Sequence, residues 1–328
     1  MTDAAIAKVA PSYFERALGP IRTLIDDPDT IEIALNPDGR VWVERAGDAV
    51  MSATDHSFTP ETARLLATQL CGQASLGVEK PMVSTSFQRR GENWRVQVIA
   101  PPVVEGGYAI ALRHHVLRDL SLSDLASSGA FAGTRRRADC VSNAENGIKA
   151  MFDTGDIESG LSAAVAARWN ILVSGGTSTG KTTVARALLN EADPHDRLVT
   201  IEDGLELHPR NPNAVALRAA VTGPNTANAL LEASLRMRPD RIVLGELRGV
   251  EAWAFLEAVN TGHPGAITTI HANTPDAAFE RLALMVLRAN LGLRKVEIID
   301  YARSVIDLVV QLERRNGRRE VLEVMVLR

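Results

Sequence analysis

A phosphate-binding loop is the clearest chemical motif in the sequence. The run GGTSTGKT over residues 175–182 matches the pattern GxxxxGK[ST] at every fixed position. An apolar stretch, 170–174, precedes the loop, and a stretch of helical character, 183–189, follows it. Glycines let the backbone wrap closely around phosphate oxygens, and the N–H groups at a helix N-terminus face the anion. The sequence therefore predicts that the chain binds a nucleoside triphosphate.

Within this loop, Lys181 is expected to reach the β- and γ-phosphates and to act in catalysis, while the hydroxyl of Thr182 is expected to hold Mg²⁺. The alternative is a plain Gly/Ser/Thr-rich turn, which the order of strand, loop and helix disfavours. The predicted nucleotide-binding residues of the loop are Gly175, Gly176, Thr177, Ser178, Thr179, Gly180, Lys181, Thr182 and Thr183.

An acidic segment follows a predicted strand over residues 197–201 and contains Glu202, Asp203 and Glu206. Carboxylates just beyond the C-terminal end of a strand lie at the crevice where α/β sheets bind ligands. We therefore expect Glu202 and Glu206 to take part in catalysis by orienting the attacking water, and Asp203 to hold Mg²⁺ through water. The alternative is an acidic helix N-terminus.

A second carboxylate ends the apolar strand predicted over residues 241–245. The position usual for a Walker B aspartate holds Gly245, so Glu246 is expected to act alone. It would act through the hydration shell of Mg²⁺ or as the base that polarises the attacking water.

His271 ends a further predicted strand, 266–270, and is therefore expected in the same crevice. A neutral imidazole there would donate a hydrogen bond to the γ-phosphate and sense its presence. The alternative is a structural or surface histidine.

Composition limits the remaining possibilities. The 328 residues suffice for two domains, and a net charge of −4 with 4% aromatic residues disfavours direct nucleic-acid binding. Two cysteines, Cys71 and Cys140, are too few for a disulfide framework or a zinc site, which fits a reducing, cytoplasmic location. Residues 1–5 lack the basic start and apolar core that are typical of a secretory signal, and no apolar run approaches the ~18 residues needed to cross a membrane. Any membrane association is expected to be peripheral.

The chain is predicted to divide into an α+β N-terminal domain (1–115), a linker (116–154) and an α/β domain (155–328) with a mainly parallel sheet. The run Arg135–Arg137 in the linker is expected to be a solvated patch. Predicted strands of the first part are 31–35, 41–44, 94–98 and 108–112, with a helix over 60–77. Those of the last part are 170–174, 197–201, 241–245, 266–270 and 304–312, with a closing hairpin at Asn316-Gly317.

Taken together, the ordered motifs resemble those of the secretion-superfamily traffic ATPases. The resemblance rests on the Walker A loop, the acidic box TIEDGLEL, the Walker B box RPDRIVLGELRG and the histidine box TGHPGAITTIHANTP. The chain is most similar to the conjugal-transfer, TrbB-type branch of type IV secretion systems, on the segments GGTSTGKTT, LRMRPDRIVLGELRG, NPDGRVWVER and RVQVIAPPVV…YAIALRHH. The resemblance covers nearly the whole chain.

This resemblance implies a Mg²⁺-dependent ATPase with a RecA-like C-terminal domain, with ATP and Mg²⁺ as cofactors. It implies a homo-oligomeric ring, usually hexameric, on the cytoplasmic face of the inner membrane, where secretion-channel or coupling proteins are its partners. By position, Glu246 would be the Walker B glutamate and His271 the histidine of the histidine box.

The resemblance also implies that arginines contact the nucleotide. Arg95 and Arg113 match N-terminal positions that reach it, and a guanidinium offers several donors to phosphoryl oxygens. Arg236, Arg238 and Arg248 are further candidates. Surface ion pairs are the alternative for each.

Other functions stay open at this point. A type IV pilus or type II secretion ATPase shares the motifs, although its relatives often carry a tetracysteine zinc module that two cysteines cannot supply. A P-loop small-molecule kinase is disfavoured because no arginine-rich lid follows the loop. The stretch 130–155 is longer than expected for the conjugal-transfer branch.

Overall fold

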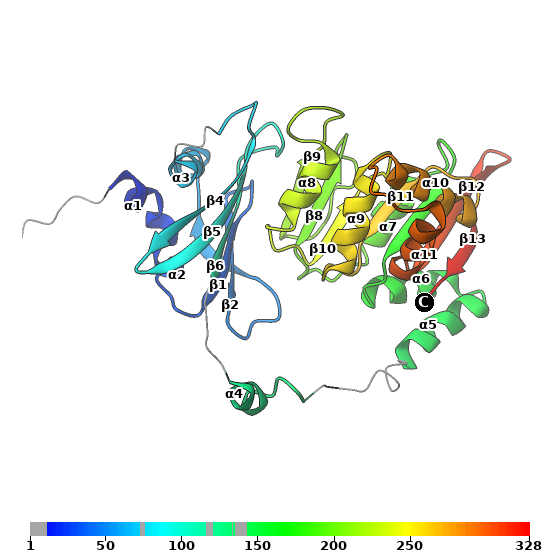
Figure 1. Ribbon diagram of the computed structural model, residues 1–328, viewed down its shortest axis with the longest axis horizontal. Coiled ribbons are helices and arrows are strands. Elements are labelled where there is room, and N and C mark those ends of the chain that lie inside the picture. The colour runs from blue at the N-terminus through cyan, green and yellow to red at the C-terminus, as the bar shows by residue number, and fades with distance from the viewer. Residues whose placement is uncertain (1–11, 73–75, 116–120, 133, 135–142) are drawn as a thin grey trace, which may run out of the picture. The chain divides into compact units, whose positions relative to one another are not determined.

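The computed structural model describes residues 12–72, 76–115, 121–132, 134 and 143–328. The chain divides into two compact units, each built on one β-sheet (Figure 1). The first unit holds the described residues up to His115 together with 222–225 and 236–238, and the second unit holds the others. One sheet is antiparallel and the other is mainly parallel, which confirms the predicted α/β class.

The N-terminal unit contains a six-stranded antiparallel sheet in the order β3-β2-β1-β6-β5-β4. Its strands are β1 (Thr30–Leu35), β2 (Arg40–Arg45), β3 (Ser52–Ser57), β4 (Met82–Arg89), β5 (Glu92–Ile99) and β6 (Ala109–His115). Its helices are α1 (Tyr13–Ala17), the 3₁₀ turn η1 (Gly19–Ile21), α2 (Arg22–Ile25) and α3 (Pro60–Cys71).

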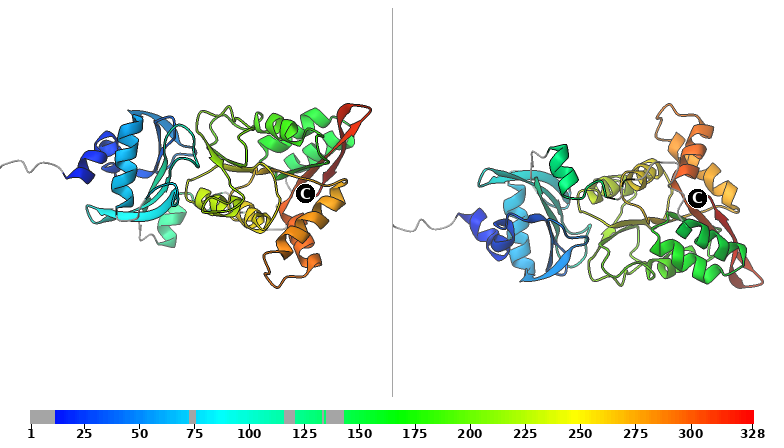
Figure 2. Two further views of the ribbon diagram at one scale, coloured as in Figure 1. Left: turned by 90° about the horizontal axis from the view of Figure 1, so that it is seen from above. Right: turned by 90° about the horizontal axis from the view of Figure 1, so that it is seen from below.

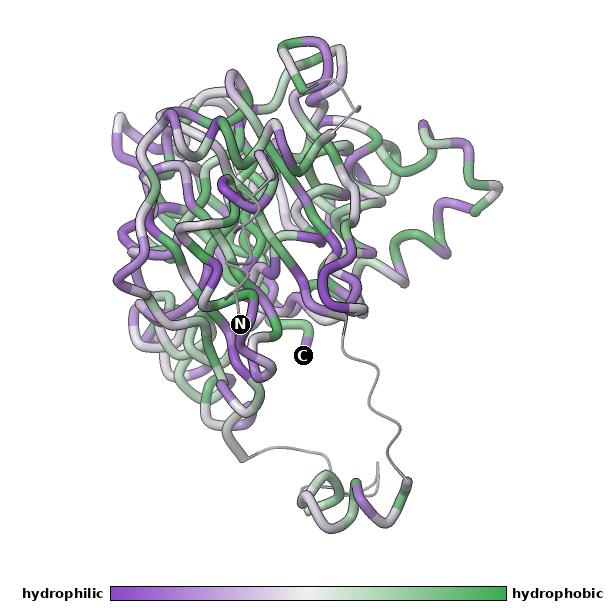
Figure 3. The backbone as a smooth tube through the Cα atoms, turned by 90° about the vertical axis from the view of Figure 1, so that its left-hand side faces the viewer, coloured by the Kyte–Doolittle hydropathy of each residue, from purple (hydrophilic) through white to green (hydrophobic). Residues whose placement is uncertain are grey.

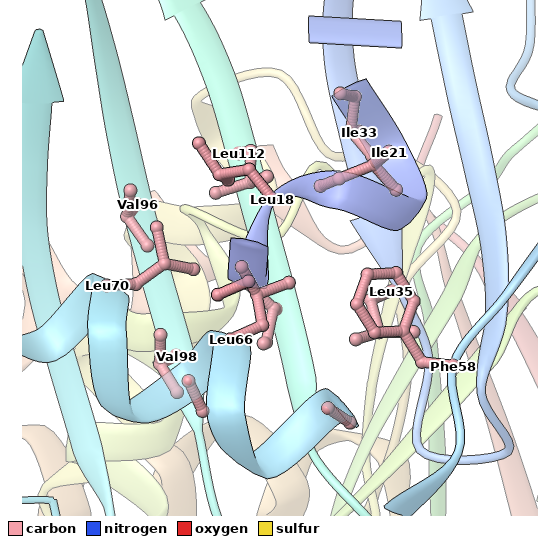
Figure 4. Packing of buried hydrophobic residues seen from close by; sticks show 14 of the residues in the cluster. Leu18, Ile21, Ile33, Leu35, Phe58, Leu66, Leu70, Val96, Val98 and Leu112 are labelled. Atoms are coloured by element: carbon pink, nitrogen blue, oxygen red, sulfur yellow. The ribbon is translucent and has the colours of Figure 1, made fainter. Parts of the chain in front are cut away.

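Helix α3 covers one face of this sheet. Thr59 caps its start by accepting the N–H of Thr62 at 3.3 Å, and Pro60 occupies the first turn, where no N–H is needed. Leu66 and Leu70 pack against side chains from the inner strands, as Figure 4 shows. The helix ends at Cys71 rather than near residue 77, because Gly72 adopts a positive φ of 53°.

The second unit contains a seven-stranded sheet in the order β13-β12-β7-β11-β10-β8-β9, parallel except for the β12–β13 hairpin. Its strands are β7 (Ile171–Gly175), β8 (Leu198–Glu202), β9 (Ala214–Arg218), β10 (Arg241–Leu244), β11 (Ile267–Ile270), β12 (Leu308–Arg315) and β13 (Arg318–Val326). Strands β7, β8, β10 and β11 are buried throughout, as expected for strands covered on both faces.

Helices cover both faces of this sheet. Figure 2 shows α6 and α7 (green) on one side and α8 to α11 (yellow to orange) on the other. Figure 3 shows that hydrophobic (green) and hydrophilic (purple) stretches alternate along the backbone. The helices are α4 (Leu122–Ser127), α5 (Asn143–Asp153), α6 (Ile157–Ala166), α7 (Lys181–Leu189), α8 (Ala227–Ser234), α9 (Glu251–Asn260), α10 (Pro275–Leu287) and α11 (Lys295–Val305).

The strand order decides where chemistry can occur. Strands β7, β11, β10 and β8 are direct neighbours and run parallel, so their C-terminal ends meet at one edge of the sheet. Every sequence motif of the C-terminal half follows one of these four strands. The predicted sheet therefore brings the motifs together as expected.

The structure differs from the predicted elements in several places. The strand predicted over 304–312 begins only at Leu308, because α11 continues to Val305. Strands β3, β4 and β9 were not predicted; β3 and β4 lie at the sheet edges, where alternate residues are exposed and the apolar pattern is weak. The hairpin turn at Asn316-Gly317 is confirmed, with positive φ at both residues.

The predicted linker over 116–154 includes residues outside the described part of the chain, among them Cys140 and the run Arg135–Arg137. Its described residues contain α4 and α5, and Ile148 of α5 is buried in the core of the second unit. The domain limits therefore remain predictions. Within the described ranges, no helix has the length and apolar character needed to cross a membrane.

A buried ion-pair cluster supports the sheet at the edge opposite the motifs. Asp196 Oδ2 accepts a hydrogen bond from Arg241 Nε at 2.6 Å, and Oδ1 accepts one from Arg168. Asp196 and Arg241 are each only 1% exposed. Removing one partner of such a pair leaves an uncompensated buried charge.

We expect Asp196→Ala to lower the free energy of unfolding by about 3–5 kcal/mol, because Arg241 would stay buried without its carboxylate. Thermal and denaturant melting of the purified chain measure this. The matched control is Asp193→Ala, whose carboxylate is exposed and lies three residues earlier. Equal melting curves for both variants would contradict a stabilising role of the cluster.

Candidate functional site

The phosphate loop has the backbone shape that anion binding requires. β7 ends at Gly175, and α7 begins at Lys181, with positive φ at Ser178 (60°) and Gly180 (95°) between them. A Cβ on Gly175 would lie 2.5 Å from Thr179 Oγ1, so a larger residue would displace that hydroxyl. Thr179 Oγ1 donates to the carbonyl oxygen of Gly176 at 3.0 Å and closes the loop. The turn delivers N–H groups toward the pocket at the start of α7.

Lys181 is buried beneath the loop. Its Nζ donates to the carbonyl oxygen of Gly176 at 2.9 Å and lies 3.3 Å from His271 Nδ1. Burial lowers the pKa of Lys181 below its ordinary value, the carboxylate of Glu246 opposes this, and the charge of Arg281 adds to the lowering.

His271 and Glu246 form the next contact. His271 Nε2 lies 3.1 Å from Glu246 Oε1, and both side chains are partly exposed to the pocket. Burial and the nearby charge of Lys181 lower the pKa of His271 below its ordinary value, so the imidazole is neutral at pH 7. A neutral imidazole at this place has one N–H to donate.

Arg248 links the two acidic segments. One of its amino groups lies 2.7 Å from Glu246 Oε2, and the other pairs with Asp203. The hydrogen bond to Glu246 raises the pKa of Arg248, so the guanidinium is charged throughout the physiological range. Charges alternate along the row Lys181, Glu246, Arg248 and Asp203, with His271 between the first two.

Glu202 makes different contacts. Its Oε1 accepts the backbone N–H groups of Glu206 and Leu207 at 2.9 and 3.0 Å, and its Oε2 accepts the hydroxyl of Thr200 at 3.3 Å. The residue is 5% exposed. By contrast, the side chains of Asp203 and Glu206 are exposed.

A cavity of about 340 Å³ in the second unit joins these groups. Most predicted site residues line it: Ser178, Gly180, Lys181, Thr182, Thr183, Glu202, Asp203, Glu206, Glu246, Arg248 and His271. Gly175, at the end of β7, and Gly176, Thr177 and Thr179, in the loop before α7, are not among the residues that line the cavity.

The other predicted arginines lie in the first unit. Arg95 and Arg113 face each other across β5 and β6, and Arg113 Nε lies 3.2 Å from Glu32 Oε2. Arg236 and Arg238 fall in the short segment 236–238, which belongs to the same unit. Contact of these four residues with a nucleotide stays a prediction.

Arg319 is a pocket residue that the sequence analysis missed. It lies on β13, opposite Arg314, and its Cδ is 3.2 Å from the place of a Cβ on Gly180. The aliphatic part of the Arg319 side chain therefore packs on the phosphate loop itself, and the residue lines the cavity. The only sequence signal is its place two residues after the hairpin turn Asn316-Gly317, which acquires meaning once β12 is known to pair with β7.

The residues present suit a magnesium nucleotide. Thr182 supplies a hydroxyl at the start of α7, and Asp203 and Glu246 supply carboxylates across the cavity. In the described part of the chain, no three His, Cys, Asp or Glu side chains form a metal cage. Mg²⁺ in such sites keeps several waters and takes its other ligands from the phosphates, so a complete protein cage is not needed.

Comparison with known proteins agrees with this geometry. The family described as type II/IV secretion system protein matches residues 140–326. The chain belongs to this family. Membership confirms the resemblance to secretion traffic ATPases and implies nucleotide binding and ATP hydrolysis.

Individual relatives match over most of their length. Protein VirB11 of Agrobacterium fabrum is 35% identical over 318 residues, which cover 94% of this chain and 91% of the relative. Conjugal transfer protein TrbB of Rhizobium radiobacter is 36% identical over 306 residues, covering 92% and 84%. The crystal structure of the VirB11 ATPase from the Brucella suis type IV secretion system, in complex with sulphate, superposes with a TM-score of 0.88 at 33% identity, covering 96% of this chain and 98% of that one.

We expect Arg319→Ala to weaken ATP binding about tenfold, because a hydrogen bond to a charged group contributes roughly 1.5–3 kcal/mol. Titration with a fluorescent ATP analogue measures the change in Kd. The control is Arg318→Ala, whose side chain points to the other face of the strand and does not line the cavity. Equal ATP affinities of the two variants would show that Arg319 does not contribute to nucleotide binding.

Proposed function

We propose that the chain is the Mg²⁺-dependent ATPase that powers a conjugative transfer or type IV secretion system. The observation that carries this proposal is the convergence of the phosphate loop, Glu246 and His271 on one cavity in the second unit. The named relatives VirB11 and TrbB support the secretion and conjugation role over a pilus or type II role.

Several residues at the cavity have a place in this reaction. The loop N–H groups and Lys181 bind the β- and γ-phosphates, and Thr182 together with Asp203 would hold Mg²⁺, which supplies charge neutralisation when bound. Glu246 accepts the proton of the attacking water. His271, neutral at pH 7, donates its N–H to the γ-phosphate.

The same proposal covers the assembly. The chain would form a homo-oligomeric ring, hexameric as is usual in the family, held peripherally at the cytoplasmic face of the inner membrane by secretion-channel or coupling proteins. Residues 1–115 would act as one domain, 155–328 as the ATPase domain and 116–154 as the linker. Arg95 and Arg113 would contribute donors to the nucleotide. The mass of the particle in solution tests the ring, and a monomer at micromolar concentration with full activity would contradict it.

We expect Lys181→Ala to abolish ATP hydrolysis, because the γ-phosphate would lose the ammonium group that lies beside the loop at Gly176. Phosphate release with Mg²⁺ present measures the rate. Lys295→Ala is the control, because Lys295 lies exposed on α11 in the same unit. Near-normal hydrolysis by Lys181→Ala would contradict the proposed function.

We expect Glu246→Gln to bind ATP with unchanged affinity and to hydrolyse it at least about 100-fold more slowly, since general base catalysis contributes roughly 10²–10⁴-fold. Single-turnover hydrolysis together with a binding titration separates the two effects. Glu257→Gln, an exposed change on α9, is the control. A wild-type rate for Glu246→Gln would show that another group removes the proton.

A further inference from the structure

Three carboxylates of the acidic and Walker B segments are candidates for the base, and the contacts of Glu202 set it apart from the other two. Glu246 and Glu206 both line the cavity, and the side chain of Glu246 is 19% exposed there. Glu202 also lies at the cavity wall, yet both of its carboxylate oxygens are bonded to groups of its own chain. Glu202 therefore holds the acidic loop 203–207 in place, and we call its two backbone hydrogen bonds the brace.

The hydrogen bonds of the brace close a short backbone turn between residues 202 and 207. Glu202 ends β8, and the chain turns through Asp203 and Gly204 before the N–H groups of Glu206 and Leu207 return to Oε1. A single oxygen that accepts two N–H groups fixes the turn between them. The turn positions the side chain of Asp203, which pairs with Arg248. Through this pair, the turn also positions the row of alternating charges described above.

Gly245 has no side chain, and this leaves room for Glu202. β8 and β10 run parallel with Leu244 beside Ile201, so Gly245 lies beside Glu202, and its N–H donates to the carbonyl oxygen of Ile201 at 2.8 Å. A Cβ on Gly245 would lie 3.1 Å from Glu202 Cγ. An aspartate at this Walker B position would occupy the space that the Glu202 side chain fills. The glycine and the glutamate therefore form one packed pair across two strands.

We propose that Glu202 is a positioning residue, which holds the acidic loop 203–207 through its two backbone hydrogen bonds, and that Gly245 is the glycine that leaves room for it. Glu202 is then neither the base nor a magnesium ligand, and Glu246 takes the proton. This inference rests on the proposed ATPase function.

The conservative variant separates the two roles. In Glu202→Gln, the amide oxygen still accepts both N–H groups, and the amide nitrogen donates to the Thr200 hydroxyl. We expect Glu202→Gln to keep kcat within about threefold of wild type with an unchanged pH profile, and Glu202→Ala to lose at least about tenfold. A loss in Glu202→Gln as large as that of Glu246→Gln would overturn the proposal.

Hydrogen–deuterium exchange supplies a readout that needs no turnover. We expect a peptide spanning residues 203–210 to exchange at least about tenfold faster in Glu202→Ala and at the wild-type rate in Glu202→Gln. Unchanged exchange in Glu202→Ala would contradict the brace. If wild type and Lys181→Ala are both inactive, the proposed function fails, while the exchange result still decides the brace.

The packing of Gly245 gives an independent test. Gly245→Ala should raise exchange in the 203–210 peptide and lower kcat at least about fivefold, because the new methyl group would lie 3.1 Å from Glu202 Cγ and crowd that side chain. In the Glu202→Ala background, the same change should add less than twofold, since the crowded Cγ is gone. Additive effects of the two substitutions would show that Gly245 and Glu202 act separately, against the proposal.

Discussion

The parallel pairing of β7, β11, β10 and β8 is the constraint on which the site depends. These strands are neighbours in the sheet although they lie far apart along the chain, and parallel pairing sends all their C-terminal ends to one edge. The phosphate loop, the histidine, the Walker B glutamate and the acidic loop each begin where one of these strands stops. Side chains over almost a hundred residues of sequence, from Ser178 to His271, therefore reach one cavity.

The electrostatics of the cavity follow from this convergence. Lys181, Glu246, Arg248 and Asp203 alternate in charge, so each buried or half-buried charge has an opposite neighbour. Burial and the ammonium of Lys181 keep His271 neutral at pH 7. In the proposed reaction, a polyphosphate with its magnesium ion would engage the cationic members of the row, and the carboxylates would face the metal and the attacking water.

Much of this arrangement could be predicted from the sequence, because continuous apolar strands followed by glycine, carboxylate or histidine identify strand ends in a parallel sheet. The edge strands β3 and β4 were missed because their solvent-facing residues dilute the apolar alternation. Arg319 was missed because only the pairing of β12 with β7 brings the terminal hairpin beside the phosphate loop. The internal bonds of Glu202 were not foreseen either, since spacing shows which carboxylates share an edge and not which atoms each one contacts.

The most direct test of the account is a structure of the protein with Mg²⁺ and a non-hydrolysable ATP analogue. The expected result has the β- and γ-phosphates on the N–H groups of residues 175–182, with Lys181 Nζ and His271 within hydrogen-bond distance of the γ-phosphate and Glu246 facing the attacking water. Phosphates bound away from this loop, or a γ-phosphate beyond the reach of both Lys181 and His271, would contradict a catalytic site built on the four strand ends.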